Sequence, residues 1–159
     1  MGGTRDLVLL LGGDMGDQER LFTEAERSLA ERLRVADLRP SRDHWTEPWG
    51  FAHPALFLNR ALWCTTTLPA HEVLDHVLAV ERELGRTREP AAGYGPRIID
   101  IDILFVGEEV HDTPALQVPH PLLHQRAFAL APAADLVPSF QHPVLQRTVL
   151  QLLNDLRPA

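Results

Sequence analysis

The feature that most constrains the fold is an apolar run near residue 100 that contains two aspartates separated by one residue. Ile98 to Val106 has the composition of a strand, and Asp100 and Asp102 fall inside it. Because side chains two residues apart on a strand share a face of the sheet, the two carboxylates should lie side by side. At about 7 Å and an effective dielectric of about 20, two ionised carboxylates repel by about 2.4 kcal/mol. The sequence therefore predicts a cation between them.

Two kinds of cation fit this pair, an arginine side chain or magnesium. Magnesium prefers oxygen ligands and is commonly held by one or two carboxylates together with substrate phosphates. Arg86, Arg88 and Arg97 precede the aspartates closely, and planar guanidinium groups suit phosphate oxygens. The arginines favour a magnesium and phosphate site, while a solvated arginine cluster that pairs with the acids stays open as the alternative.

Length and charge limit the class of protein. The chain has 159 residues, 45% of them hydrophobic, and no internal repeat is evident, so residues 1–159 should form one compact domain with a real core. The formal net charge is −7, whereas non-specific binding to a phosphate backbone or a membrane surface needs an excess of positive charge. We therefore expect neither nucleic acid nor a membrane as a partner.

The basic and sulfur-containing residues narrow the chemistry further. All 15 basic residues are arginine. Without lysine the chain has neither a Walker A phosphate loop nor a Schiff base. Its one cysteine, Cys64, lies in an alternating strand pattern, which favours core packing in a reducing compartment. With no signal peptide and no 18-residue apolar run, we expect a cytoplasmic protein.

The first third of the chain predicts a strand, a helix and a second strand. Leu7 to Leu11 suits a strand buried on both faces, and the glycine-containing segment Leu11 to Gly16 suggests a tight turn with close approach of the backbone. Gly16 and Asp17 supply a turn and an N-cap, after which apolar residues recur at helical spacing until about Arg34. These apolar residues are Leu21, Phe22, Ala25, Leu29 and Leu33. Val35 to Trp45 is a plausible strand broken by Pro40.

The middle of the chain predicts a clearer strand at Asn59 to Thr67, after a loop at Thr46 to Phe51, and then a helix that Pro69 opens. Gly85 is expected to end this helix. Its apolar stripe is formed by Leu74, Val77, Leu78 and Leu84. Glu81 lies on the same stripe, where an acid either reaches sideways to an arginine or contacts a ligand.

The order strand, helix, strand, strand, helix, strand is typical of the ferredoxin-like pattern. We therefore expect an α+β fold with a βαββαβ core, in which helices pack on an antiparallel sheet. Val118 to Ala159 should add one or two further helices, and Val144 to Leu156 suits a short amphipathic one.

A second candidate site segment runs from Val118 to Phe128. His120 and His124 are four residues apart and could ligate zinc on a helix, but no third ligand is obvious nearby. With Arg126 and Phe128 following, the segment more plausibly offers an imidazole and a guanidinium to a phosphate, beside an aromatic plane for a flat ring. The alternative is a capped turn with Phe128 in the core.

These motifs together resemble the 6-hydroxymethyl-7,8-dihydropterin pyrophosphokinase family nearly end to end. Gly95 to Leu104 resembles the family signature, in which Gly-Pro-Arg is followed after two residues by Asp, an apolar residue and Asp. Further segments agree in order and spacing. They are Thr46 to Gly50, Phe57 to Asn59, Leu84 to Arg88, Val118 to Pro121 and Arg126 to Phe128.

The resemblance implies an activity and a set of ligands. Members of this family move the β,γ-diphosphate of ATP onto a reduced pterin alcohol in folate biosynthesis, which makes the chain a magnesium-dependent pyrophosphokinase and, by expectation, a monomer. Asp100 and Asp102 match the aspartates that hold two Mg²⁺ ions. ATP is the co-substrate. The residues of this chain that match the family's catalytic residues along the ATP triphosphate are Arg86, Arg88, Arg97, His120 and Arg126. Glu81 is added to this nucleotide-binding set.

The resemblance also implies how the pterin is held. Asn59 and the segment of Thr46, Glu47, Pro48 and Trp49 match groups that hydrogen-bond to the edge of the pterin. Phe57 and Phe128 match the aromatics that sandwich its ring, and Tyr94 stands where a closing loop often offers an aromatic lid.

Two positions depart from the family pattern. Gly13-Asp14 stands where the family commonly has Ser-Asn, and His44 stands where an aromatic residue is usual. Two rival functions stay open from the residues alone. One is a noncatalytic ferredoxin-like binding module, and the other is a magnesium-dependent kinase or nucleotidyltransferase with another acceptor.

Overall fold

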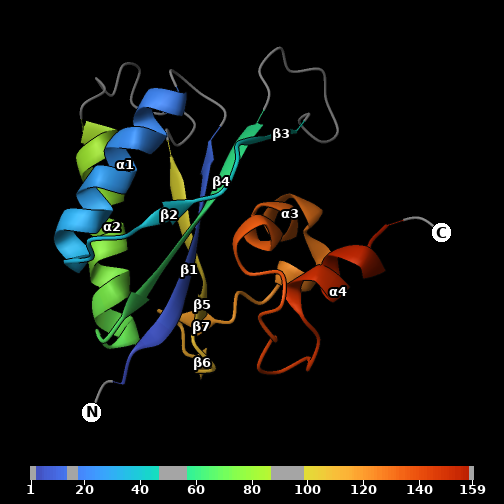
Figure 1. The fold of residues 1–159 in the computed structure, drawn as a ribbon. Coiled ribbons are helices and arrows are strands. Elements are labelled where there is room, and N and C mark those ends of the chain that lie inside the picture. The colour runs from blue at the N-terminus through green and yellow to red at the C-terminus, as the bar shows by residue number, and fades with distance from the viewer. Residues whose placement is uncertain (1–2, 14–17, 47–56, 87–98, 158–159) are drawn as a thin grey trace.

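The central element is an antiparallel sheet with helices on both faces (Figure 1). The computed structural model describes residues 3–13, 18–46, 57–86 and 99–157. Its sheet strands are β1 (Arg5–Gly13), β2 (Arg39–Pro40), β3 (His44–Thr46), β4 (Phe57–Thr66) and β5 (Asp100–Val106). They are ordered β2-β4-β1-β5, and β3 pairs with the other end of β4.

The helices divide between the two faces of the sheet. Helices α1 (Gln18–Leu33) and α2 (Ala70–Arg86) lie together on one face, and α3 (Ala127–Leu136) and α4 (Val149–Asp155) lie on the other (Figure 1). A small separate ribbon is formed by β6 (His111–Asp112) and β7 (Gln117–Val118). Every pairing is antiparallel. The predicted α+β class, with a ferredoxin-like core and added C-terminal helices, is confirmed.

The middle strand β1 is buried on both faces, as its apolar run predicts. Leu7, Leu9 and Leu11 belong to the core beneath α1 and α2. Val8 and Leu10 belong to the core beneath α3 and α4. Neighbouring residues of β1 thus pack into two different apolar layers. Both faces of the strand must therefore be apolar, which explains why its sequence is a continuous apolar run.

Helix α2 buries a different stripe from the one that its leucines predict. The buried residues are Ala70, Val73, Val77, Val80 and Leu84, spaced by three, four, three and four residues. Leu78 is 41% exposed, so its place in the predicted stripe is wrong. The helix also continues through Gly85 to Arg86. Glu81 follows Val80 and therefore stands at the flank of the buried stripe.

The region before β4 is split more strongly than the sequence suggests. Val35 to Trp45 forms two short strands, β2 and β3, on the same side of β4. Gly12 and Gly13 lie inside β1, opposite Asn59 and Leu58 of β4, so these two residues still belong to the strand. The rest of the segment for which a tight turn is predicted, Asp14 to Gly16, lies outside the described residues. The predicted turn and N-cap at Gly16 and Asp17 lie outside the described residues.

The C-terminal layer is closed by aromatic and capping contacts. The ring of Phe105 on β5 lies 4.7 Å from that of Phe140 and 5.7 Å from that of His142. Thr148 and Gln151 cap α4 reciprocally, with side chain and backbone hydrogen bonds of 2.9 and 3.1 Å. The helix is shorter than Val144 to Leu156 because Val144 and Leu145 precede this cap, where both are exposed.

Cys64 is buried and unpaired in the layer under α1 and α2. Burial raises the pKa of its thiol to about 11. The predicted core-packing role is confirmed. None of the helices in the described part of the chain combines the length and the apolar composition needed to span a bilayer.

Candidate active site

Polar residues and a glycine form a row across one end of the sheet. In the strand register His44 of β3 stands opposite Asn59 of β4, Asn59 opposite Gly12 of β1, and Gly12 opposite Asp100 of β5. Paired residues of antiparallel strands point to the same face, and adjacent strands lie about 4.8 Å apart. The backbones of Asn59 and Asp100 are thus about 10 Å apart, with only a glycine between them.

The row faces α3. Leu10, two residues before Gly12, packs in the core beneath α3 and α4, and it pairs with Asp102. Asp100 and Asp102 therefore project side by side from this face, as the alternation of the strand predicts. Both are half-buried, whereas Ile101 and Ile103 are buried in the opposite layer.

Any side chain at Gly12 would crowd the amide of Asn59. A Cβ atom built on Gly12 would lie 3.1 Å from Oδ1 of Asn59. That is tighter than ordinary van der Waals contact, so a larger residue would displace the Asn59 amide. Sequence reasoning missed Gly12 as a site residue, although a glycine inside a strand signals the close approach of a ligand or another backbone.

Three of the residues expected at the pterin, Asn59, Phe57 and Thr46, lie at the same end of β4. Asn59 is 6% exposed. Phe57 is two residues away on the same face, half-buried, and pairs with Thr46 of β3. The structure thus brings Asn59, Phe57 and Thr46 together.

His120 lies beside the aspartates, at the outer edge of β5. Its backbone N–H donates to the Leu104 carbonyl at 3.1 Å, and its Nδ1 accepts from the Leu122 backbone N–H at 3.3 Å. Burial lowers the pKa of His120, the Asp102 carboxylate opposes this shift, and the Arg126 guanidinium adds to it. The hydrogen bond to Leu104 places the backbone of His120 two residues along β5 from Asp102.

The start of α3 supplies an exposed aromatic ring. Phe128, in the first turn, is 41% exposed, so the alternative that placed its ring in the core is wrong. The guanidinium carbon of Arg126 lies 5.6 Å from the centre of this ring. A guanidinium and an aromatic ring therefore lie together at the N-terminus of α3.

Glu81 reaches the site through the backbone of β5. Its Oε2 accepts a hydrogen bond from the Ile101 N–H at 2.7 Å. The sequence proposed either an arginine or a ligand as its partner, and this contact with the residue between the two aspartates could not be found from spacing.

Several expected site residues cannot be placed. Glu47, Pro48, Trp49, Arg88, Tyr94 and Arg97 lie outside the described residues. Arg86 is the last residue of α2. Among the residues that the structure does describe, no group of three or more histidine, cysteine or carboxylate side chains could hold a metal. Two carboxylates suit Mg²⁺ all the same, because this ion takes few protein ligands when phosphates and water complete its shell.

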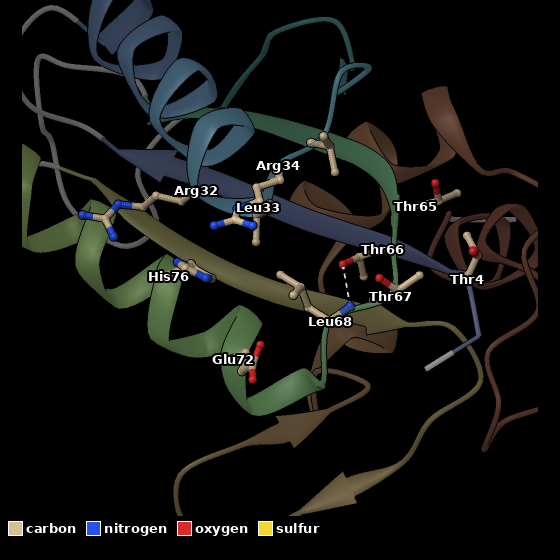
Figure 2. A pocket seen from close by; sticks show the side chains of 11 residues that line it. Thr4, Arg32, Leu33, Arg34, Thr65, Thr66, Thr67, Leu68, Glu72 and His76 are labelled. Carbon is tan, nitrogen blue, oxygen red and sulfur yellow. Dashed lines mark hydrogen bonds between the residues drawn. The ribbon is translucent and has the colours of Figure 1, made fainter. Parts of the chain in front are cut away.

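A cavity of about 610 Å³ lies at the opposite end of the sheet (Figure 2). Its walls come from the end of α1, the end of β4 and the start of α2. The charged residues on these walls are Arg32, Arg34 and Glu72, and His76 lies among them. Arg32 is already paired with Glu83. The cavity is lined by charges of both signs and by several threonine hydroxyls. It shares no residue with the row that ends at Asp100.

Comparison with known proteins gives one consistent family for the chain. The family model described as 7,8-dihydro-6-hydroxymethylpterin-pyrophosphokinase (HPPK) matches residues 8–138. The chain is 38% identical over 128 residues to the 2-amino-4-hydroxy-6-hydroxymethyldihydropteridine pyrophosphokinase of Bacillus subtilis, covering 80% of this chain and 75% of that protein. It is 41% identical over 141 residues to the Porphyromonas gingivalis protein of the same name, covering 86% and 93%.

Solved structures show the same fold. The HPPK-DHPS of Plasmodium falciparum superimposes with a TM-score of 0.73 at 16% identity, over 98% of this chain. The chain spans 46% of that longer protein. It also covers 27% of a bifunctional folate synthesis protein of Arabidopsis thaliana, at 36% identity over 132 residues.

Proposed function

Since the chain belongs to the 7,8-dihydro-6-hydroxymethylpterin-pyrophosphokinase family, we propose that the row from Asn59 to Asp100 is where it transfers diphosphate from ATP to the pterin alcohol. This transfer is a step of folate biosynthesis, and the chain is a pyrophosphokinase. One observation supports the proposed location. On the face of the sheet toward α3, only Gly12 separates the buried amide of Asn59 from the carboxylates of Asp100 and Asp102.

Asn59 is the proposed anchor of the pterin. A buried amide offers both a donor and an acceptor, which match the alternating donors and acceptors of a pterin edge. Phe57 and Phe128 would cover the faces of the ring, because Phe57 lies on the α3 side of the sheet and Phe128 exposes its ring at the start of α3. Gly12 would leave space for the hydroxymethyl group on its way to Asp100.

Asp100 and Asp102 are the proposed ligands of Mg²⁺. When bound there, two magnesium ions would neutralise charge on the phosphates and on the attacking and leaving oxygens. The support is chemical, since these two half-buried carboxylates stand side by side and sequence predicts arginines near them. His120 and Arg126 are proposed to contact the phosphates together with Arg86, Arg88 and Arg97.

The transfer itself needs no protein nucleophile. The hydroxymethyl oxygen of the pterin attacks the β-phosphorus of ATP and loses its proton, and the bond between that phosphorus and the oxygen bridging it to the α-phosphorus breaks. The products are the pterin diphosphate and AMP. The residues of the row position the two substrates in line, and the cationic side chains stabilise the charge.

The test is AMP release from ATP and Mg²⁺, with and without 6-hydroxymethyl-7,8-dihydropterin. We expect AMP that depends on the pterin and that disappears in Asp100→Ala. Release of ADP would indicate a simple kinase, and release of inorganic diphosphate would indicate a nucleotidyltransferase. A folded protein that gives no AMP would favour a binding module.

We further propose that residues 1–159 act as one catalytic domain, as a monomer and in the cytoplasm. The buried, unpaired Cys64 supports a reducing compartment. Light scattering across a range of protein concentrations tests the monomer, because a dimer would double the measured mass.

A further inference from the structure

One carboxylate joins the short edge strand β3 to helix α3. Oδ2 of Asp135 lies 2.9 Å from Nε2 of His44 and accepts the backbone N–H of Arg42 at 3.2 Å. The Arg42 guanidinium donates to both oxygens, at 3.2 and 2.9 Å. Asp135 therefore holds two alternate residues of the chain that leads into β3.

The electrostatics agree with this geometry. Burial opposes ionisation of Asp135, but the hydrogen bonds from Arg42 and His44 outweigh it and hold its pKa below the usual value. The Arg42 side chain is 80% exposed, whereas those of His44 and Asp135 are 21% and 16% exposed. The hydrogen bonds from Arg42 have the larger effect on this pKa, but its guanidinium is exposed to solvent, whereas the His44 contact is shielded on both sides.

The residue between Arg42 and His44 is held on the opposite face. Asp43 accepts from Arg60 of β4 at 2.6 and 3.1 Å, and Arg60 also pairs with Glu26 of α1. Successive residues are thus fixed alternately to α3 and to β4. This double attachment matters because, within the described residues, β3 consists of three residues and pairs with one strand, β4.

Both elements that Asp135 joins carry residues proposed to bind the pterin. β3 ends in Thr46, which stands opposite Phe57. In α3, Phe128 lies seven residues before Asp135, hence on the same side of the helix and about 10 Å away along its axis. The carboxylate is therefore a brace between the two sides of the proposed pterin site.

We propose that Asp135 is a positioning residue for pterin binding, which acts through His44 and Arg42 by fixing β3 relative to α3. This inference rests on the proposed function, because it takes Thr46, Asn59 and Phe128 as pterin contacts. His44 is a position where this sequence departs from the family pattern, so the brace belongs to the residues of this chain.

The test compares Asp135→Ala with Asp155→Ala. Asp155 forms a similar two-pronged pair with Arg147, at 2.8 and 2.9 Å, on α4 and away from the row. We expect Asp135→Ala to weaken pterin affinity about tenfold and to leave nucleotide affinity within about twofold. The reason is that a displaced β3 would move the residues that contact the pterin and not those that contact the nucleotide. Asp155→Ala should leave both affinities unchanged. Calorimetric titration with the pterin, in the presence of a non-hydrolysable ATP analogue, gives the two values.

A second measurement separates positioning from a general loss of stability. Hydrogen exchange should become faster at the amides of residues 44–46 in Asp135→Ala, and the KM for the pterin should rise while kcat changes little. His44→Ala should reproduce the effect, and the double variant should be no worse than Asp135→Ala, because both changes remove one interaction.

The outcomes distinguish this inference from the proposed function. If Asn59→Ala weakens pterin binding and Asp135→Ala does not, the brace is overturned and the site stands. If the wild-type protein does not bind the pterin at all, the proposed function and the inference are both overturned. Equal loss of pterin and nucleotide affinity in Asp135→Ala would also overturn the brace, since it would mean a global effect.

Discussion

Glu81 Oε2 and the Ile101 backbone N–H form a 2.7 Å hydrogen bond that attaches helix α2 to the residue between the two aspartates. β5 is the last strand on its side of the described sheet, so an amide on its outer edge has no strand partner. A side-chain acceptor replaces that partner. Because Asp100 and Asp102 flank Ile101, the position of Glu81 helps to fix where both carboxylates stand.

Glu81→Ala should therefore weaken magnesium-dependent nucleotide binding by about 10- to 100-fold, the usual cost of losing a group that orients metal ligands. Glu81→Gln keeps an acceptor oxygen and should stay much closer to the wild type. Titration of a non-hydrolysable ATP analogue in Mg²⁺ measures both. Hydrogen exchange at Ile101 should speed up in the Ala variant alone, and equal losses in the two variants would indicate that the charge matters, not the hydrogen bond.

Asp102→Asn should lower the rate of AMP release by several orders of magnitude. A neutral amide lacks the negative charge with which a carboxylate binds magnesium. The fold should survive, since Asp102 is only half-buried. Asp112→Asn is the matched control, because Asp112 lies in the separate ribbon β6 and contacts Gln117. Rates are measured by quantifying AMP, and circular dichroism checks the fold. Near-normal turnover in Asp102→Asn would reject the metal assignment.

Gly12→Ala should weaken pterin binding by about tenfold or more, the typical effect of one misplaced carbon atom in a binding site. Its Cβ would lie 3.1 Å from Asn59 Oδ1 and push that amide out of position. Pterin titration tests this, and Gly3→Ala is a control because nothing lies within 4 Å of its Cβ. If Gly12→Ala binds the pterin normally, Asn59 has room to adjust and the row is wider than the backbone suggests.

His142 should make the protein less stable in mild acid. It is 5% exposed, and its Nδ1 accepts the backbone N–H groups of Val144 and Leu145 at 3.2 and 3.0 Å. Burial lowers its pKa, with a smaller contribution from His124. As the pH falls, the unfolded chain, with a histidine pKa of about 6.5, takes up a proton at a higher pH than folded His142 does. The contribution of neutral His142 to the free energy of unfolding is therefore complete above about pH 6.5 and is lost as the pH falls below it.

Urea unfolding between pH 8 and pH 5 measures this effect. His120 also has a lowered pKa and adds to the same slope, so the comparison is with His142→Asn, in which the amide oxygen can still accept. The variant should lose less stability on acidification than the wild type. An identical pH dependence would show that His142 stays neutral or contributes nothing over this interval.

Local patterns in the sequence predicted much of the fold. The apolar run of β1 specified a strand buried on both faces, and the spacing from Phe22 to Leu33 specified the buried side of α1. Alternation placed Asp100 and Asp102 on one face before any tertiary contact was known. The α2 stripe was misjudged because leucine was taken as the core residue, whereas Val73 and Val80 are buried and Leu78 is exposed.

The sequence by itself determined the elements of this protein and the carboxylate pair, because periods of two and of 3.6 residues are local properties of a backbone. Only the tertiary structure decided what stands beside that pair. The row through Gly12 depends on strand register, and the contacts of Glu81 with Ile101 and of Asp135 with His44 join residues 20 and 91 positions apart. Such contacts follow from how helices pack on a particular sheet, and spacing along the chain carries no information about that packing.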